Sequence, residues 1–176
     1  MNIFTYDSDF GNLVIAAEND AIVLMKLNVP KETAFKSLSD IDDYSFSPSK
    51  FTDNAAKALE EYFAGKRKEF DLPLRPKGTD FQRSVWNALM TIPYGETRSY
   101  MQVAQMLGNP KACRAVGLAN NKNPIWIIIP CHRVIGSDGS LVGYGGGLET
   151  KKTLLSLESE TVNSQMTTLV FFNRNY

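Results

Sequence analysis

The feature that most constrains the fold is an interruption near the middle of the chain, Pro73-Leu74-Arg75-Pro76-Lys77-Gly78. Proline lacks an amide hydrogen and glycine weakens regular structure, so neither a helix nor a strand is expected to continue through this segment. Strand-like and helical patterns alternate before it, whereas helical patterns dominate after it. We therefore expect a mixed α/β domain over residues 1–76, a mostly helical domain over residues 77–158 and a C-terminal tail over residues 159–176.

The first half contains the patterns of a small sheet with helices. Two apolar runs, Gly11–Glu18 and Ala21–Leu27, flank Asn19-Asp20 and predict a β-hairpin. Short helices are expected at Lys31–Leu38 and Phe51–Ala64, and a further strand at Glu69–Leu72. No catalytic motif is visible in these residues.

The second half begins with a helix that Thr79 or Asp80 can cap. Ser99 can cap another helix, which ends at Gly108-Asn109-Pro110. Pro110 suits the first position of a following helix, Lys111–Ala119. Two helices joined by a short glycine-containing turn are typical of a helix-turn-helix, although the same spacing also fits an ordinary helical hairpin.

Charge is unevenly distributed although the net charge is zero. Residues 1–76 carry 9 basic and 13 acidic side chains, whereas residues 77–176 carry 10 and 6. The stretch from Thr97 to Arg133 holds five basic residues and no acidic one. This stretch indicates either a surface for a polyanion such as DNA or a chance cluster on a solvated face.

Hydrophobic residues make up 43% of the chain, enough for a packed core. The longest apolar runs are too short to span a membrane, and the N-terminal residues lack the form of a secretory signal. We expect a cytoplasmic protein, or a nuclear one if the source is a eukaryote, with no membrane partner.

The candidate nucleophile is Cys131, which follows the apolar run Ile125–Ile129 and precedes His132, the single histidine. The run predicts a buried strand or extended segment. Neighbouring residues of an extended chain point to opposite sides, so a direct Cys–His bond would need a turn there, or a bridging water. Without other evidence, a buried structural thiol is the alternative. One histidine and two distant cysteines make a zinc site unexpected.

The run Asn123–Val134, which contains Pro-Cys-His-Arg-Val, resembles the active-site segment of the O6-alkylguanine-DNA alkyltransferases. Other blocks similar to that family follow its order: Phe81–Trp86, Ile92–Thr97, Gly108–Pro110, Arg114–Gly117 and Tyr144–Leu148. The resemblance is close over residues 79–158 and general over residues 1–72. It implies a ribonuclease H-like α/β N-terminal domain and a winged-helix-like C-terminal domain, without metal or cofactor.

The resemblance also implies a reaction, in which one protein molecule takes an alkyl group from O6 of guanine, or O4 of thymine, onto Cys131. The damaged base must first leave the duplex. The resemblance implies that His132 is a base that acts through a water, and that Glu158 orients this histidine. Tyr100 protonates the leaving base, and Asn123 braces the active-site turn. The implied partner is double-stranded DNA containing O6-alkylguanine, bound by a monomer.

Binding roles follow from the same resemblance. The residues implied to bind the flipped base are Trp126, Val134, Tyr144, Gly145 and Gly146. The residues implied to contact DNA are Asn109, Lys111, Arg114, Ala115, Gly117, Asn120 and Ser137. Among these, Arg114 is the residue implied to enter the stack and fill the gap that the base leaves, with the helix in the minor groove.

Two positions depart from the family pattern. Trp126 stands where the family usually has a proline, and Gly145 stands where some relatives have a serine.

Two other functions compete with alkyl transfer: a DNA-binding module with an inert Cys131, and a cysteine hydrolase that turns over. The tail matches no family block, and its Thr168–Phe172 stretch is expected to be a strand or a partner contact.

Overall fold

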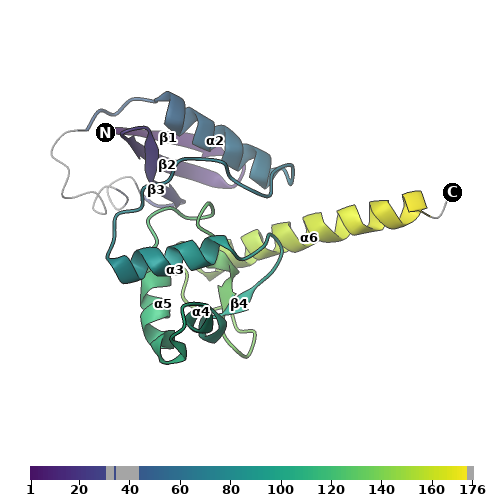
Figure 1. Ribbon diagram of the computed structural model, residues 1–176. Helices are drawn as coiled ribbons and strands as arrows, with labels where there is room; N and C mark the ends of the chain where they lie inside the picture. Colours follow the sequence, from purple (N-terminus) through teal and green to yellow (C-terminus); the bar gives the residue numbers. More distant parts are fainter. Residues whose placement is uncertain (31–33, 35–43, 174–176) are drawn as a thin grey trace.

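The computed structural model in Figure 1 describes residues 1–30, 34 and 44–173, with side chains described as far as residue 164. The helix expected at Lys31–Leu38 therefore lies, apart from Ala34, outside the described residues. Within the described part, the chain has the expected mixed α/β class, with a sheet in the first half and helices in the second.

The first half forms a three-stranded antiparallel sheet of β1 (Asn2–Ser8), β2 (Gly11–Glu18) and β3 (Ala21–Leu27), in that order. The predicted β2–β3 hairpin is confirmed, and Asn19 and Asp20 both have positive φ, as a type I′ turn requires. Strand β1 was not expected. The predicted helix α2 (Lys50–Phe63) is also confirmed; it starts at a capping box on Ser49 and lies across the sheet.

The strand expected at Glu69–Leu72 was wrong. The segment is irregular and joins the sheet only beyond it, where Leu74 forms a single bridge with Ile22. Amides of Ile22 and Arg75 complete the two hydrogen bonds there, to Pro73 O and Ile22 O. Because Pro73 and Pro76 have no N–H group, the pairing stops after this bridge.

The second half contains the predicted helices. Thr79 caps α3 (Asp80–Met90), and Ser99 caps α4 (Tyr100–Met106), each through a capping box. The next helix was predicted over Lys111–Ala119, with Pro110 suited to its first position. Instead, Pro110–Ala112 form a 3-10 turn, η1, and the α-helix α5 runs from Cys113 to Asn121. Helices α4 and α5 pack on one another and on α3 (Figure 1).

The long helix α6 (Leu148–Asn173) closes the chain and projects away from the two domains (Figure 1). The strand considered for Thr168–Phe172 was wrong, because these residues belong to α6. The tail expected from Ser159 is a continuation of the same helix that carries Glu158. In the part of the chain that the structure describes, no helix is long and apolar enough to cross a membrane.

The two halves share one hydrophobic core, which contains residues from Leu13 on β2 to Leu154 on α6. They also meet through backbone pairing. Met25 of β3 donates to Pro124 O at 2.9 Å and accepts from the Trp126 amide at 3.0 Å, which makes a parallel bridge with Ile125. The segment leading to Cys131 is thus attached to the sheet of the first half.

Candidate active site

The segment Ile125–Ile129 is buried as expected, but its conformation is not that of a strand. Only Ile125 pairs with β3, and the chain then turns, with Ile127 at a φ of 67°. The Asn123 amide explains the turn, because its Oδ1 accepts from Ile125 N at 3.0 Å and its Nδ2 donates to Ile129 O at 2.9 Å. One side chain therefore closes a compact loop directly before Pro130.

Cys131, His132 and Arg133 form the short 3-10 turn η2, and Val134 and Ile135 form β5, which pairs in parallel with β4 (Arg98–Ser99). The turn supplies the change of direction that an extended chain would lack. Residues 131, 132 and 133 are exposed by only 2%, 0% and 6%. A thiol, an imidazole and a guanidinium are therefore held together inside the protein.

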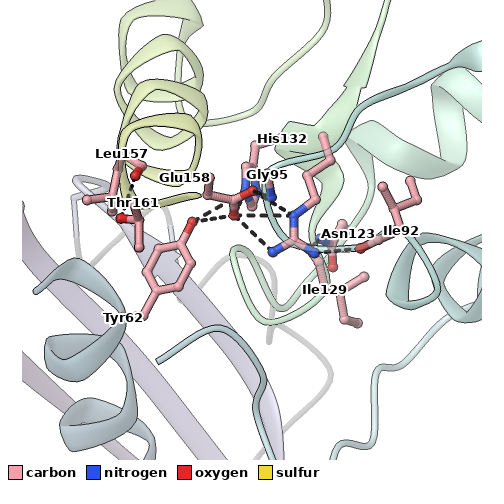
Figure 2. A network of polar contacts seen from close by, with 10 residues as sticks. Tyr62, Ile92, Gly95, Asn123, Ile129, His132, Leu157, Glu158 and Thr161 are labelled. Atoms are coloured by element: carbon pink, nitrogen blue, oxygen red, sulfur yellow. Dashed lines mark hydrogen bonds and ion pairs between the residues drawn. The ribbon is translucent and has the colours of Figure 1, made fainter. Parts of the chain in front are cut away.

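Glu158 on α6 is the centre of a buried polar network (Figure 2). Its carboxylate accepts a hydrogen bond from His132 Nε2 at 2.9 Å. It also accepts hydrogen bonds from Arg133 Nε and Nη2 at 3.0 and 2.9 Å. Tyr62 of α2 donates to it at 2.7 Å, and Gly95 N donates at 3.0 Å. Burial raises the pKa of Glu158, but the hydrogen bonds from His132 and Arg133 and the positive charge of Arg133 outweigh burial and lower this pKa to about 2.

The network fixes the protonation of His132. Since Nε2 faces a carboxylate, it carries the hydrogen, and Nδ1 is left as a free base. Nδ1 is buried and has no hydrogen-bond partner within the protein. Burial lowers the pKa of His132 even though Glu158 opposes the shift, so the imidazole is neutral at pH 7. A buried lone pair of this kind fits a bound water.

Burial also raises the pKa of the Cys131 thiol. Four groups oppose that effect: the Asn123 amide, the ammonium groups of Lys26 and Lys151, and the backbone amide of Cys131 itself. Lys151 of α6 donates to Val134 O and to Val142 O. Uncharged and protonated at rest, the thiol is nevertheless surrounded by groups that favour its anion.

The aromatic side of the site consists of Trp126, Tyr144 and two glycines. The ring centroids of Trp126 and Tyr144 are 5.5 Å apart. A Cβ on Gly145 would lie 2.7 Å from Trp126 Cζ2, and one on Gly146 would lie 2.9 Å from Trp126 Cζ3. The indole therefore occupies the space that a side chain at either glycine would need. Tyr100 completes this side, where it donates to Val142 O at 3.1 Å.

The expected DNA-contacting residues divide into two groups. Six lie on or near the surface formed by the helix-turn-helix and the loop after β5: Asn109, Lys111, Arg114, Ala115, Gly117 and Ser137. Asn120 is different, because it is only 2% exposed and its amide donates to Cys131 O at 3.3 Å. We reassign Asn120 from the DNA surface to the support of the Cys131 backbone.

Four polar residues of the site were missed at the level of sequence: Lys26, Tyr62, Arg133 and Lys151. Two of them belong to the first half, and their positions near Cys131 depend on how the two halves pack. Arg133 was visible in the Pro-Cys-His-Arg-Val motif but was given no role. Within the described residues, no three His, Cys, Asp or Glu side chains come together as a possible metal site.

Two family models match the chain. The ribonuclease-like domain of 6-O-methylguanine DNA methyltransferase matches residues 3–76, and the DNA binding domain of the same protein matches residues 80–160. The chain belongs to the 6-O-methylguanine DNA methyltransferase family. Among curated relatives of this family, a methylated-DNA–protein-cysteine methyltransferase of Methanosarcina acetivorans is 48% identical over 153 residues, 87% of this chain and 95% of the relative.

The family likeness extends to solved structures. The protein of the same name from Mycobacterium tuberculosis is 48% identical over 163 residues, 93% of this chain and 95% of the relative. A crystal structure of Mycobacterium tuberculosis OGT in complex with DNA superposes with a TM-score of 0.81 at 44% identity, covering 92% of this chain and 94% of that one. The similarity therefore covers both halves and not only the Cys131 motif.

Proposed function

We propose that this chain repairs alkylated DNA by moving a methyl or other alkyl group from O6 of guanine to Sγ of Cys131, as a methylated-DNA–protein-cysteine methyltransferase. One observation carries the mechanism: Glu158 holds the Nε2 hydrogen of His132, so that the unpartnered Nδ1 is available as a base beside a buried thiol. Base and orienting carboxylate together activate a weak nucleophile.

In the reaction, His132 Nδ1 takes the thiol proton through a water, and the Cys131 thiolate attacks the alkyl carbon. The S–C bond forms as the C–O6 bond breaks, and the electron pair leaves with guanine. Tyr100 supplies the proton that neutralises the guanine anion; burial raises the pKa of its hydroxyl, so it remains protonated until then. A thioether has no simple hydrolytic exit, so each molecule reacts once. O4 of thymine presents the same alkyl–oxygen bond.

The proposed DNA surface is the exposed face of α5 with its neighbouring turn. Arg114, which is exposed there, would enter the stack when the damaged base turns outward, and the small side chains of Ala115 and Gly117 allow close approach. Trp126, Val134, Tyr144, Gly145 and Gly146 would surround the flipped base. We propose that a monomer performs the whole reaction on double-stranded DNA.

The test of the reaction is intact mass before and after incubation with duplex DNA containing O6-methylguanine. We expect one added methyl group per protein, mapped by peptide mass to Cys131 and absent from Cys131→Ser. The matched control is Cys113→Ser, which removes the other thiol and should react as wild type does. Product beyond one equivalent, or label on another residue, would contradict the proposal.

The test of base flipping compares two substrates for Arg114→Ala. Flipping costs a few kcal/mol, so transfer from duplex DNA should slow by about a hundredfold, whereas transfer from a free O6-alkylguanine base should not change. Lys122→Ala removes a positive charge at the opposite end of α5 and should have a smaller effect. Equal losses on both substrates would show that Arg114 acts on folding or chemistry instead.

A further inference from the structure

Lys26 of β3 is an unusual feature, because it is a cation from the first half of the chain buried against the active-site segment. It is 9% exposed. Its ammonium donates to Asn123 O at 2.8 Å, the carbonyl of the residue whose side chain closes the loop before Cys131. Removing an ammonium from water is unfavourable, and a methionine of similar length would fill the same space without that penalty.

The same ammonium lies 4.2 Å from the centre of the Trp126 ring. This is cation–π geometry, which is strongest for tryptophan and for partners removed from water. The indole Nε1 also donates to Asn123 O, at 3.0 Å. Lys26, Trp126 and Asn123 therefore form a closed triangle of contacts, two of whose members flank the alkyl pocket and the Cys131 loop.

The charge of Lys26 also reaches Cys131. Burial lowers the pKa of Lys26 to about 8, while the Cys131 thiolate raises it. In the reverse direction, Lys26 lowers the pKa of Cys131. Cys131 also raises the pKa of three other titratable groups, which are Lys151 on α6, Tyr144 in the loop before α6 and Tyr100 on α4. Of these, only Lys151 is a second cation.

We propose that Lys26 is a positioning residue for alkyl transfer, whose ammonium holds Trp126 and the Asn123 carbonyl in place and whose charge favours the Cys131 thiolate. This inference rests on the proposed role of Cys131 as alkyl acceptor. It gives the first half of the chain a direct part in the reaction, through a strand that carries no catalytic motif.

The test uses Lys26→Gln, which keeps a donor for Asn123 O but loses the charge, together with Lys26→Met and Lys26→Arg. The control is Lys57→Met, on the exposed face of α2. For each folded variant, the rate of Cys131 alkylation by iodoacetamide is measured across pH by peptide mass. The single-turnover rate with O6-benzylguanine free base is measured in parallel.

We expect the midpoint of the pH profile to rise by about one unit in Lys26→Gln and Lys26→Met, which slows both reactions by about tenfold near pH 7. Lys26→Arg should restore the wild-type midpoint, and Lys57→Met should not alter it. An unchanged midpoint in the neutral variants would overturn the inference, even if their thermal stability fell. Failure of the proposed function would be distinct, because wild type itself would then carry no alkyl group from DNA on Cys131.

Discussion

Cys131 lies between two regions that are built on different principles. On one side, Glu158 is surrounded by hydrogen-bond donors from three separate segments, and every contact has a defined direction. On the other side, Trp126 is held by Asn123 O and Lys26 but contacts Tyr144 and two glycines only through its shape. The polar side sets protonation and allows little change. The aromatic side sets volume, so its residues can be exchanged in compensating pairs.

The substitution expected to disrupt the polar side most is Glu158→Gln. The amide cannot satisfy the buried donors of both His132 and Arg133, so His132 loses its orientation and a buried charge loses its partner. We expect transfer to fall by about a thousandfold and the free energy of unfolding to fall by about 3–5 kcal/mol.

Single-turnover transfer and urea denaturation measure these two losses. Glu160→Gln is the control, because Glu160 is an exposed carboxylate on the same helix. A Glu158→Gln variant with near wild-type transfer would show that the network has only a structural role.

Acid should weaken the polar side selectively. The pKa of Glu158 is about 2 in the folded protein and near its ordinary value when unfolded. A carboxyl with a depressed folded pKa stabilises the fold above its unfolded pKa, and this stabilisation is lost as pH falls toward the folded value. Between about pH 4.5 and pH 2, wild type should lose about 3 kcal/mol through Glu158 alone.

Urea denaturation at a series of pH values in that window measures the effect. The free energy of unfolding should depend more steeply on pH for wild type than for Glu158→Gln, which has no carboxyl to titrate at this position. Identical pH dependences would contradict the assigned charge state.

The aromatic side should respond to volume. Restoring a proline at position 126 would remove the amide that bonds Met25 O, so Trp126→Leu is the better variant. If the indole narrows the alkyl pocket, the ratio of benzyl to methyl transfer rates should rise by about tenfold. The ratio is measured with free base analogues at a temperature where both proteins are folded. An unchanged ratio would place the indole in the core and outside the pocket.

The smallest expected effect is a coupling between the two positions that depart from the family pattern. Gly145→Ser should destabilise wild type, because its Cβ would lie too close to the Trp126 ring. In a Trp126→Leu background the same change should be milder, giving a coupling energy of about 1 kcal/mol. Thermal unfolding of the four proteins in this cycle tests it. Additive effects would show that the residues at positions 126 and 145 do not interact.

The sequence was most informative where local rules apply. Helix caps at Thr79 and Ser99, the β2–β3 hairpin and the Pro-Cys-His-Arg-Val motif all depend on neighbouring residues. It was least informative where distant segments meet. Tyr62 is 96 residues from Glu158, and Lys26 is 97 residues from Asn123, so neither contact leaves a local pattern.

The wrong expectation for Ile125–Ile129 has a different cause. Its apolar residues do enter the core, but the Asn123 side chain takes the hydrogen bonds that a neighbouring strand would have made. A run of buried residues indicates burial alone, because side-chain bonds to the backbone can override the extended conformation. The turn at Cys131 follows from this competition.

The bridge between Met25 and Ile125 bears on how such a protein can be recombined. Residues 1–76 and 77–173 look like separable modules, yet the loop that presents the reactive sulfur takes its register from the first of them. A chimera that joins this C-terminal half to a foreign N-terminal half would therefore inherit a working nucleophile only if the donor strand offered the same pairing, a lysine at position 26 and a tyrosine at position 62. The two halves of the chain must therefore be exchanged together.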